Sequence, residues 1–267
     1  MIRTLQFIGF IEPAKRGITK PLIIQAKGLD GRRETIFLKT NAGYADKPQS
    51  AGVELFTTLA ARRLGLTAPE PVLVEVPEKA GRLVHDAPEH ADLLNRSAGL
   101  NFGTLALGAD WKVWLPELST RSFMAETVES ALAFDGLVQH TDREALNPNL
   151  MWKGHELAVL DHEKVFGYLT LAQGEAKPWR PFFQARPFAR HVLAPAGRRL
   201  MRADFGKRMW ESILEQEWGG GFDECLQAAE AAFPAAKVDL ARIRAYLTTL
   251  AADAGDFFDY LKVSLQP

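Results

Sequence analysis

Two aspartates and two asparagines, all with hard oxygen ligands, lie in residues 139–166, which read QHTDREALNPNLMWKGHELAVLDHEKVF: they are Asp142, Asn147, Asn149 and Asp161. Such hard ligands suit Mg²⁺, which binds one or two protein groups and completes its octahedron with water and phosphate oxygens. A nearby carboxylate that does not bind the metal can accept a proton from an attacking hydroxyl. The segment predicts a magnesium site at Asn147 and Asp161, with Asn149 as a second candidate because it shares a strand face with Asn147. Asp142 is the predicted general base.

A hairpin would bring these groups together. NLMWKGHELAVL has apolar residues on both sides of Lys153-Gly154. A two-residue turn at these positions predicts three pairs in one register: Trp152–His155, Leu150–Leu157 and Asn147–Leu160. Because neighbouring strands lie about 4.8 Å apart, Asn147 and Asp161 would meet at the open end of the hairpin. Asp142 would stand close by, at the end of the preceding helix.

Capping is the alternative interpretation of these residues. Asp and Asn at turns and helix ends most often accept hydrogen bonds from backbone N–H groups. For one such residue capping is the better interpretation, but three at the two ends of one hairpin favour a site. A metal on phosphates, a base on the nucleophile and fixed positive charge are the parts that phosphoryl transfer needs.

The order of these residues carries a resemblance. Asp-x-x-x-x-Asn, a short hairpin and an Asp after an apolar strand follow the protein-kinase order, with HTDR (140–143) and DHE (161–163) in place of H-R-D and D-F-G. TDREALNPNLMW and LAVLDHEKVF resemble the HipA-like kinases, particularly their short branch with N-P-N-L and L-D-H. The resemblance covers about residues 15–166. It implies a kinase that uses ATP and Mg²⁺ and transfers the γ-phosphoryl group to Ser or Thr of a protein.

Lys39 and Glu54 are the candidates for the nucleotide-binding lysine and the glutamate that orients it. Lys39 ends the apolar strand TIFLK, as the phosphate lysine of the family does. Glu54 stands between apolar residues in a predicted helix, so a partly buried position is expected, and a buried carboxylate needs a partner. The alternatives are a lysine that leaves a strand into solvent and an exposed helix glutamate.

A phosphate-binding loop is the weakest part of the pattern. EPAKRGITKP (12–21) contains Gly17, and its backbone N–H groups could hold phosphate, with the Thr19 hydroxyl in support. HipA-like kinases have a similar short loop with Gly and Ser/Thr. A solvated basic turn is the alternative. The chain has no G-x-x-x-x-G-K-[ST], which argues against a Walker-type NTPase.

Strands come first along the chain and helices follow. We predict strands at 4–11, twice within 21–40, at 71–76 and through 100–107, and helices at 48–65 with Gly65 as the stop, near 88–96, and at 122–138, 203–217, 222–232 and 238–263. This order favours an α+β protein with two unequal lobes. The resemblance implies a bilobal protein-kinase-like fold, with a small strand-rich N-lobe at 1–110 and a mostly helical C-lobe at 111–267.

Composition narrows the class of protein. The 267 residues are 47% hydrophobic and 24% charged, which is ordinary for a globular chain. The formal net charge of −1 indicates no particular partner. A single cysteine, Cys225, excludes an internal disulfide and a C-x-x-C metal site. We find no signal peptide and no run near the roughly 18 apolar residues of a membrane span, so we expect a cytoplasmic protein without a membrane partner.

Two further segments stand out. Residues 177–208 hold nine basic residues and one acid. An acidic substrate, a tRNA-associated protein or, only indirectly, nucleic acid are the partners that such a stretch could bind. A solvated basic face paired with acids elsewhere is the alternative. The glycine-bearing segment 97–108 reads as a glycine-punctuated strand or as part of the nucleotide site. Arg143 could contact phosphate or form a structural ion pair, and His140 and His162 could orient backbone and Asp161.

Two rival functions stay open. One is a small-molecule kinase of similar fold, and the other is a non-catalytic pseudokinase or interaction module. The complete set of Lys39, Asp142, Asn147 and Asp161 argues against a scaffold, and the basic stretch argues against a small-molecule acceptor. The length leaves no room for the extra N-terminal subdomain of full-length HipA toxins, which argues against an antitoxin partner.

Overall fold

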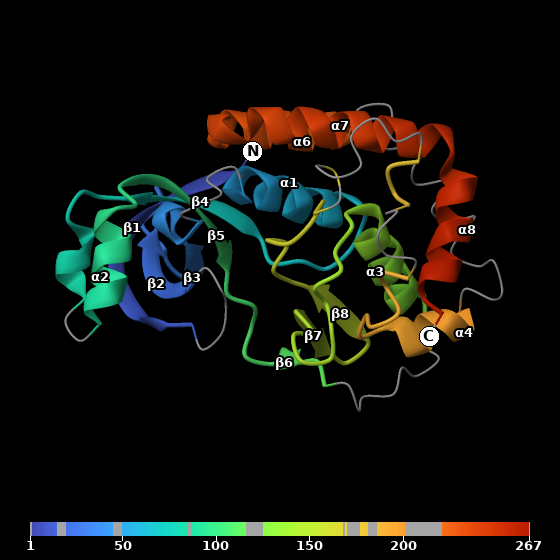
Figure 1. The fold of residues 1–267 in the computed structure, drawn as a ribbon. Coiled ribbons are helices and arrows are strands. Elements are labelled where there is room, and N and C mark those ends of the chain that lie inside the picture. Colours follow the sequence, from blue (N-terminus) through green and yellow to red (C-terminus); the bar gives the residue numbers. More distant parts are fainter. Residues whose placement is uncertain are drawn as a thin grey trace. The chain divides into compact units, whose positions relative to one another are not determined.

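A computed structural model describes residues 2–14, 20–44, 50–84, 87–115, 125–167, 169, 177–180, 186–200 and 221–266 (Figure 1). The chain forms two compact units. The first comprises Met1–Leu59, Pro69–Gly108 and Gln227–Asp239, and the second Ala60–Ala68, Ala109–Leu226 and Leu240–Pro267. The strand-rich N-terminal region and the helical C-terminal part confirm the mixed α+β class.

The first unit is built on a closed five-stranded barrel. Its strands are β1 (Arg3–Pro13), β2 (Leu22–Lys27), β3 (Arg33–Lys39), β4 (Pro71–Val76) and β5 (Gly99–Leu105), in the order β1-β2-β3-β5-β4. All five were predicted, but the closure was not. It depends on a parallel pairing of β1 with β4, which joins strands far apart in the sequence. Closure removes the unpaired edges that an open sheet would present.

Alternating side chains fill the barrel. Leu22, Ile24 and Ala26 on β2 are buried, as are Ile36 and Leu38 on β3, in agreement with a period of two. The glycine-bearing segment is part of this packing. A Cβ on Gly103 of β5 would lie 2.7 Å from Cγ2 of Ile36, so that position accepts only glycine without a shift. The glycine-punctuated strand is the interpretation that the structure supports for this residue.

Short helices connect the strands of the first unit. They are η1 (Asn41–Tyr44), η2 (Ala80–Leu83) and α2 (Pro88–Asn95), together with α1 (Ser50–Arg63), whose last turn belongs to the second unit. The predicted helices at 48–65 and 88–96 are confirmed. α1 ends just before Gly65, and the Leu66 N–H donates to the carbonyl of Ala61 at 3.0 Å, a hydrogen-bonding pattern that ends many helices.

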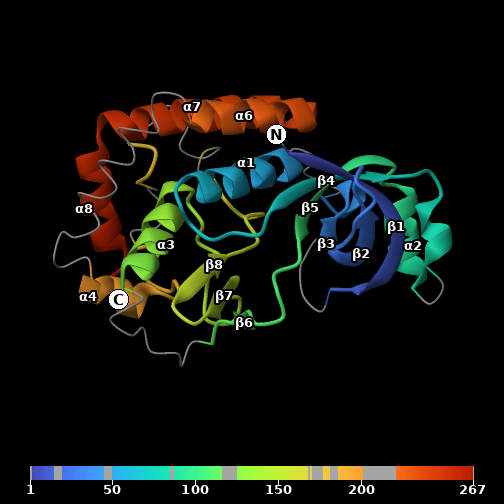
Figure 2. The same cartoon turned by 180° about the vertical axis from the view of Figure 1, so that it is seen from behind.

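The second unit combines a small sheet with helices. The sheet has the order β6-β7-β8, with β6 (Lys112–Val113), β7 (Leu150–Lys153) and β8 (Glu156–Val159). The helices are α3 (Ala125–Leu137), α4 (Ala194–Leu200), α6 (Gly221–Ala232), α7 (Lys237–Ala252) and α8 (Ala254–Ser264). Parts of α6 and α7, and the short helix η5 (Pro234–Ala236) between them, belong to the first unit. α3 packs against β8 and α4 (Figure 2). No helix in the described ranges is long and apolar enough to cross a membrane.

One helix prediction is wrong, and another cannot be compared because it falls outside the described residues. The single helix predicted at 238–263 is wrong, because α7 and α8 are separate helices with Asp253 between them. Asp253 has φ −139° and ψ 45°, a non-helical conformation that interrupts the helical hydrogen bonding without a side-chain cap. The helix predicted at 203–217, and residues 122–124 of the helix predicted before the hairpin, fall outside the described residues.

The predicted register of the hairpin is wrong by two positions. The observed pairs are Lys153–Glu156, Trp152–Leu157, Met151–Ala158 and Leu150–Val159. The two-residue turn is therefore Gly154-His155. Gly154 has φ +56°, which glycine adopts without strain, whereas a turn at Lys153-Gly154 would ask the same of a lysine. Continued, this register places Asn149 opposite Leu160, and the Leu160 N–H donates to the Asn149 carbonyl at 3.0 Å.

Candidate active site

The first unit contains a buried ion pair between Lys39 and Glu54. Lys39 ends β3 and Glu54 lies in α1, and the Lys39 Nζ is 2.7 Å from Glu54 Oε1. The exposed fraction of the side chain is 11% for Lys39 and 3% for Glu54. The Tyr44 hydroxyl donates to the other carboxylate oxygen, Oε2, at 2.7 Å. Both oxygens of Glu54 are therefore bonded, and the Lys39 side chain is the less buried of the two.

A polar cluster holds the segment that carries Tyr44. Asn101 on β5 is fully buried, and its Oδ1 accepts from the Asn41 N–H at 2.7 Å. Its Nδ2 donates to the carbonyls of Ser97 and Gly99 at 2.7 and 2.8 Å. The Ser97 hydroxyl in turn accepts a hydrogen bond from the backbone N–H of Ala42 in η1 at 3.0 Å. The segment 97–101 thus fixes η1 after β3.

Sequence reasoning missed Tyr44 and Asn101. Their signal was indirect, because Ser97 and Asn101 lie in the glycine-bearing segment that the sequence had marked without assigning a role. A side chain that bonds backbone groups many positions away leaves no periodicity in the sequence. Only the pairing of β3 with β5 brings the two segments together.

Asp142 lies in the second unit, in the loop after α3, with contacts to both of its carboxylate oxygens. Asn147 Nδ2 donates to Asp142 Oδ2 at 3.0 Å. The Lys164 ammonium donates to Asp142 Oδ1 at 3.2 Å. The Asp142 side chain is 33% exposed, so it reaches solvent while two neighbours hold it. Lys164 was not predicted, since nothing in its spacing marks it.

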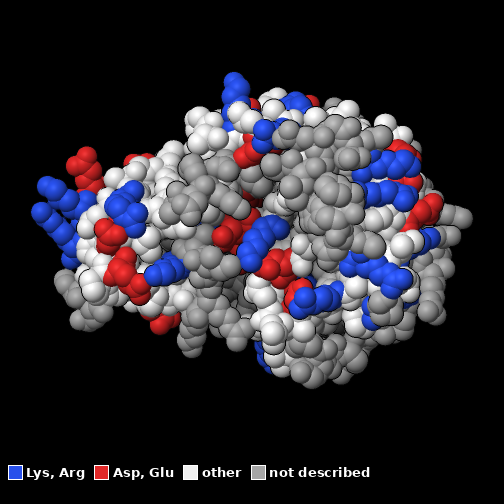
Figure 3. Space-filling model, in the orientation of Figure 1, with Lys and Arg blue, Asp and Glu red and all other residues white. Residues whose placement is uncertain are grey.

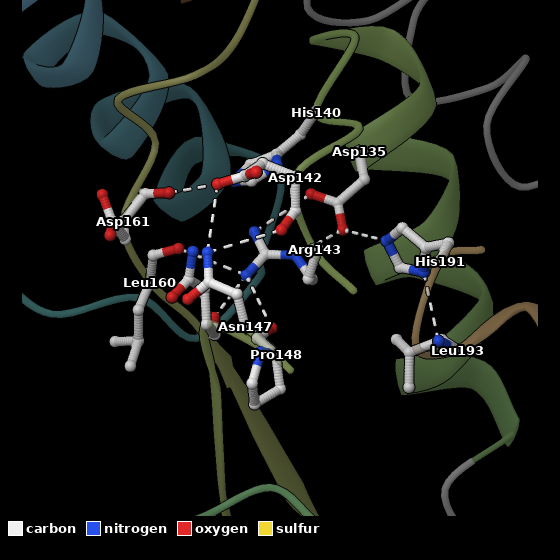
Figure 4. A network of polar contacts seen from close by, with 11 residues as sticks. Asp135, His140, Asp142, Arg143, Asn147, Pro148, Leu160, Asp161, His191 and Leu193 are labelled. Carbon is white, nitrogen blue, oxygen red and sulfur yellow. Dashed lines mark hydrogen bonds and ion pairs between the residues drawn. The ribbon is translucent and has the colours of Figure 1, made fainter. Parts of the chain in front are cut away.

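Arg143 is fully buried and clamps the base of the hairpin (Figure 4). Its Nε and Nη2 donate to the two carboxylate oxygens of Asp135 on α3, at 2.7 and 3.1 Å. Its Nη1 donates to the backbone carbonyls of Asn149, of Leu160 at 3.2 Å and of Pro148 at 3.5 Å. Asn149 and Leu160 stand on opposite strands of the hairpin, so one guanidinium joins both to α3. Of the two interpretations of Arg143, the structural ion pair is correct.

Asp135 carries its charge in a fully buried position. Burial alone would raise the pKa of this carboxyl group, but the charge of Arg143 and the hydrogen bond with His191 outweigh burial and hold the pKa well below its ordinary value. His191 Nε2 donates to Asp135 Oδ2 at 2.9 Å, and its Nδ1 accepts from the Leu193 N–H at 3.1 Å. Because Nδ1 accepts, the proton that His191 donates to Asp135 is on Nε2. Neither Asp135 nor His191 was predicted.

His140 positions the backbone of Asp161, as the sequence suggested. His140 Nε2 lies 2.9 Å from the carbonyl oxygen of Asp161, and because a carbonyl only accepts, Nε2 carries the proton. Burial, followed by the charge of Arg143, lowers the pKa of His140 to about 4. Burial likewise lowers the pKa of His162 well below 6.5. Both rings are neutral at pH 7.

The backbone around Asp161 adopts an unusual conformation. Among the described residues of the second unit, four that are not glycine have left-handed φ: Gln139 at 54°, Asn149 at 44°, Asp161 at 53° and Phe166 at 54°. Asn and Asp tolerate this region, whereas the other two cost roughly 1–3 kcal/mol each. Such residues cluster at functional sites, where the surrounding structure holds them. In Figure 4 the Asp161 carboxylate points away from the Arg143–Asp135 pair.

The remaining predicted ligands lie as follows. Asn147, Asn149 and Asp161 are all half-buried in the second unit, and the structure does not rank Asn149 against Asn147 as a ligand. Gly17 and Thr19 fall outside the described residues. Within the described ranges, no group of three or more His, Cys, Asp or Glu side chains is arranged to hold a metal.

The basic stretch at 177–208 makes structural contacts. Four of its described members bond within the second unit: Lys177 and Arg180 to Asp256 at 2.6 and 2.5 Å, Arg190 to Glu144 at 2.9 Å, and Arg198 to the Leu265 carbonyl at 2.8 Å. On the face shown in Figure 3, described acidic and basic side chains likewise lie close to one another. For these four residues, pairing with acids and carbonyls is the interpretation that the structure supports.

Comparison with known families agrees with this chemistry. A family model described as HipA-like kinase matches residues 8–177, more than half of the chain. The chain belongs to the HipA-like kinase family, which confirms the resemblance drawn from residues 139–166. Membership implies a phosphotransferase, and kinases generally use ATP and Mg²⁺. No curated protein matches the chain.

Proposed function

We propose that this protein is an ATP-dependent kinase that transfers the γ-phosphoryl group to a hydroxyl, with Ser or Thr of a protein as the acceptor. The proposal includes a bilobal protein-kinase-like fold, in which residues 1–110 form the nucleotide-binding N-lobe and residues 111–267 the C-lobe with the catalytic loop. Family membership supports the kinase class. The acceptor class rests on the family resemblance alone.

Lys39 neutralises the α- and β-phosphates in this proposal. Glu54 and Tyr44 hold the lysine side chain: Glu54 balances its charge, and Tyr44 fixes the second carboxylate oxygen. A lysine that is held in one position has already lost its side-chain freedom, so less entropy is lost when phosphate binds. Gly17 and Thr19 complete the phosphate contacts through backbone N–H groups and a hydroxyl.

Asp142 accepts the proton of the acceptor hydroxyl. The hydroxyl oxygen then attacks the γ-phosphorus while the bond to the β–γ bridging oxygen breaks, and the electron pair leaves with ADP. Asn147 donates to Asp142 Oδ2, so Oδ1 is the oxygen that takes the proton. The partial exposure of Asp142 lets an acceptor reach it.

The residues present fit a magnesium ion. Because Asn147 uses Nδ2 to bind Asp142, its Oδ1 is directed elsewhere and can serve as a hard ligand. Asp161 offers a carboxylate whose backbone is held by His140. Asn147 and Asp161, with Asn149 as the alternative amide, would hold the ion, which when bound neutralises phosphate charge.

The observation that carries the proposal is the buried Lys39–Glu54 pair. A buried lysine and glutamate of this kind contribute little net stability, because desolvation offsets their attraction. A contribution to stability therefore does not account for this ion pair beside an apolar barrel core. Binding of phosphate by the ammonium group of Lys39 would account for it.

The test measures binding and transfer separately. ATP affinity is titrated with and without Mg²⁺, and transfer is followed as autophosphorylation from radiolabelled ATP. We expect Asp142→Asn to bind ATP within about threefold of wild type and to lose transfer by at least about 100-fold. We expect Asp161→Asn to lose the Mg²⁺-dependent part of ATP binding.

Asp110→Asn serves as the matched control, since Asp110 is an exposed acid of the second unit that pairs with Lys153. It should behave as wild type. Equal Mg²⁺-dependent affinity in Asp161→Asn and wild type would contradict the metal assignment. A wild-type protein that does not bind ATP would leave only an interaction module. Transfer to a sugar or aminoglycoside but to no protein would establish the small-molecule alternative.

A further inference from the structure

Lys164 contacts the proposed base directly. Its Nζ lies 3.2 Å from Asp142 Oδ1, and its side chain is 48% exposed. It follows Asp161 by three residues and so belongs to the same loop after β8. Asn147 occupies the other carboxylate oxygen of Asp142. The oxygen that should take the proton is therefore the one that holds the lysine.

The other charged residues of the loop cannot supply a cation there. Arg143 is fully buried and donates inward to Asp135 and to backbone carbonyls. Glu144, two residues after Asp142, is an acid, and Arg190 pairs with it at 2.9 Å. Among the described residues, Lys164 is the one cation that forms an ion pair with Asp142.

Phosphoryl transfer needs positive charge near the γ-phosphoryl group. Charge spreads over its three equatorial oxygens in the transition state, and fixed donors aimed at them lower the barrier. An acceptor hydroxyl that hydrogen-bonds to Asp142 must also lie within about 3–3.5 Å of the γ-phosphorus to react. A cation in contact with Asp142 is consequently within one side-chain movement of the γ-oxygens.

We propose that Lys164 is a catalytic residue that moves from Asp142 Oδ1 to the γ-phosphoryl oxygens when ATP and the acceptor bind. This rests on the proposed kinase function. The movement frees Oδ1 to accept the hydroxyl proton and places an ammonium group on the transferring phosphoryl group. Lys164 donates hydrogen bonds and keeps its own proton; the hydroxyl proton goes to Asp142 and the electron pair of the broken bond goes to ADP.

The test compares Lys164→Met, which removes the charge at similar length, with Lys164→Arg, which keeps it. The probe is Mg²⁺-ATP, and autophosphorylation gives kcat and the KM for ATP. We expect Lys164→Met to lower kcat by about 100- to 1,000-fold, as removal of one transition-state donor does, with KM changed less than about threefold. Lys164→Arg should retain kcat within about tenfold.

A control and a stability measurement complete the experiment. Lys153→Met removes another exposed lysine of the same unit, one that pairs with Asp110 at 2.7 Å, and should leave kcat unchanged. Thermal unfolding should be the same for all variants, because exposed ion pairs add little stability. A kcat that is unchanged or raised in Lys164→Met would overturn the proposal, since the lysine would then only obstruct the base.

Equal loss in Lys164→Arg and Lys164→Met would also overturn it, because charge would not be the property that matters. Either result with an active wild type leaves the kinase function standing. A wild type without ATP binding or transfer refutes the kinase function itself. The two failures are therefore distinguishable.

Discussion

Arg143→Met should destabilise the second unit severely. The substitution removes the positive partner of Asp135, a fully buried carboxylate, and breaking one side of a buried ion pair costs about 3–5 kcal/mol. It also removes the donor to the Leu160 carbonyl, and an unsatisfied buried acceptor costs about 1–3 kcal/mol. The Asn149 carbonyl keeps the Leu160 N–H, whereas the Leu160 and Pro148 carbonyls both lose the guanidinium donor. Because such terms are not additive, we expect a loss of about 4–6 kcal/mol.

That loss is a large part of the roughly 5–15 kcal/mol by which a domain is stable. Urea denaturation followed by tryptophan fluorescence measures it. Arg180→Met is the matched control, because Arg180 also pairs with an aspartate, Asp256, but is 44% exposed; it should lose less than about 1 kcal/mol. The double variant Arg143→Met/Asp135→Leu should recover part of the loss, since no charge stays buried alone.

An Arg143→Met protein that loses no more stability than Arg180→Met would refute the reasoning. It would mean that the guanidinium does not hold α3 to the hairpin. A double variant less stable than Arg143→Met would show that Asp135 contributes through other contacts. The free energy of unfolding distinguishes these results without any activity assay.

Three further predictions follow from burial and hydrogen bonding. Folding lowers the pKa of His140 from 6.5 to about 4. The unfolded chain therefore binds this proton first as the pH falls, and the free energy of unfolding should drop by about 3 kcal/mol between pH 6.5 and 4. Urea titrations should show a weaker pH dependence for His140→Gln, and an equal pH dependence of the free energy of unfolding would contradict this. Tyr44→Phe removes a hydrogen bond to a carboxylate and should lower the free energy of unfolding by about 2 kcal/mol. Tyr246→Phe removes a hydrogen bond to a neutral carbonyl and should lower it by about 1 kcal/mol. Equal losses in urea denaturation would show that the charge of Glu54 does not strengthen the Tyr44 hydrogen bond. Asn101→Ala removes the acceptor for the Asn41 N–H, so hydrogen exchange at that amide should accelerate at least about tenfold, and unchanged protection would mean that Asn101 does not hold η1.

The first unit shows how far local pattern reaches. Short runs rich in apolar and β-branched residues predicted β2, β3 and β4, because such runs form strands that are buried on one or both faces. The position of Glu54 between apolar residues predicted a buried carboxylate that needs a partner, and the structure places it in contact with Lys39. The catalytic roles of both stay a proposal. Closure of the barrel through β1 and β4 was not predictable, because strand pairing across a long connection leaves no local signal.

The hairpin shows where local pattern fails. Its two strands were evident from apolar residues, but their register depended on whether Gly154 stood first or second in the turn. The predicted turn placed it second, after Lys153, whereas the observed strand pairing places it first, with a left-handed φ. The shift replaces Asn147 by Asn149 opposite Leu160, yet Asn147 still reaches Asp142 through its amide. A contact between neighbours on one loop survives an error in register.

By itself the sequence determined the family and the α+β class and predicted the residues proposed to carry the chemistry, because short spacings and hydrophobic periodicity record local geometry. Tertiary structure alone decided what holds these residues. Arg143 donates to the buried Asp135, Asn101 accepts from the backbone of the turn that carries Tyr44, and Lys164 pairs with Asp142. Each contact joins segments whose separation in sequence carries no pattern, and only burial and hydrogen-bond satisfaction in the folded chain select them.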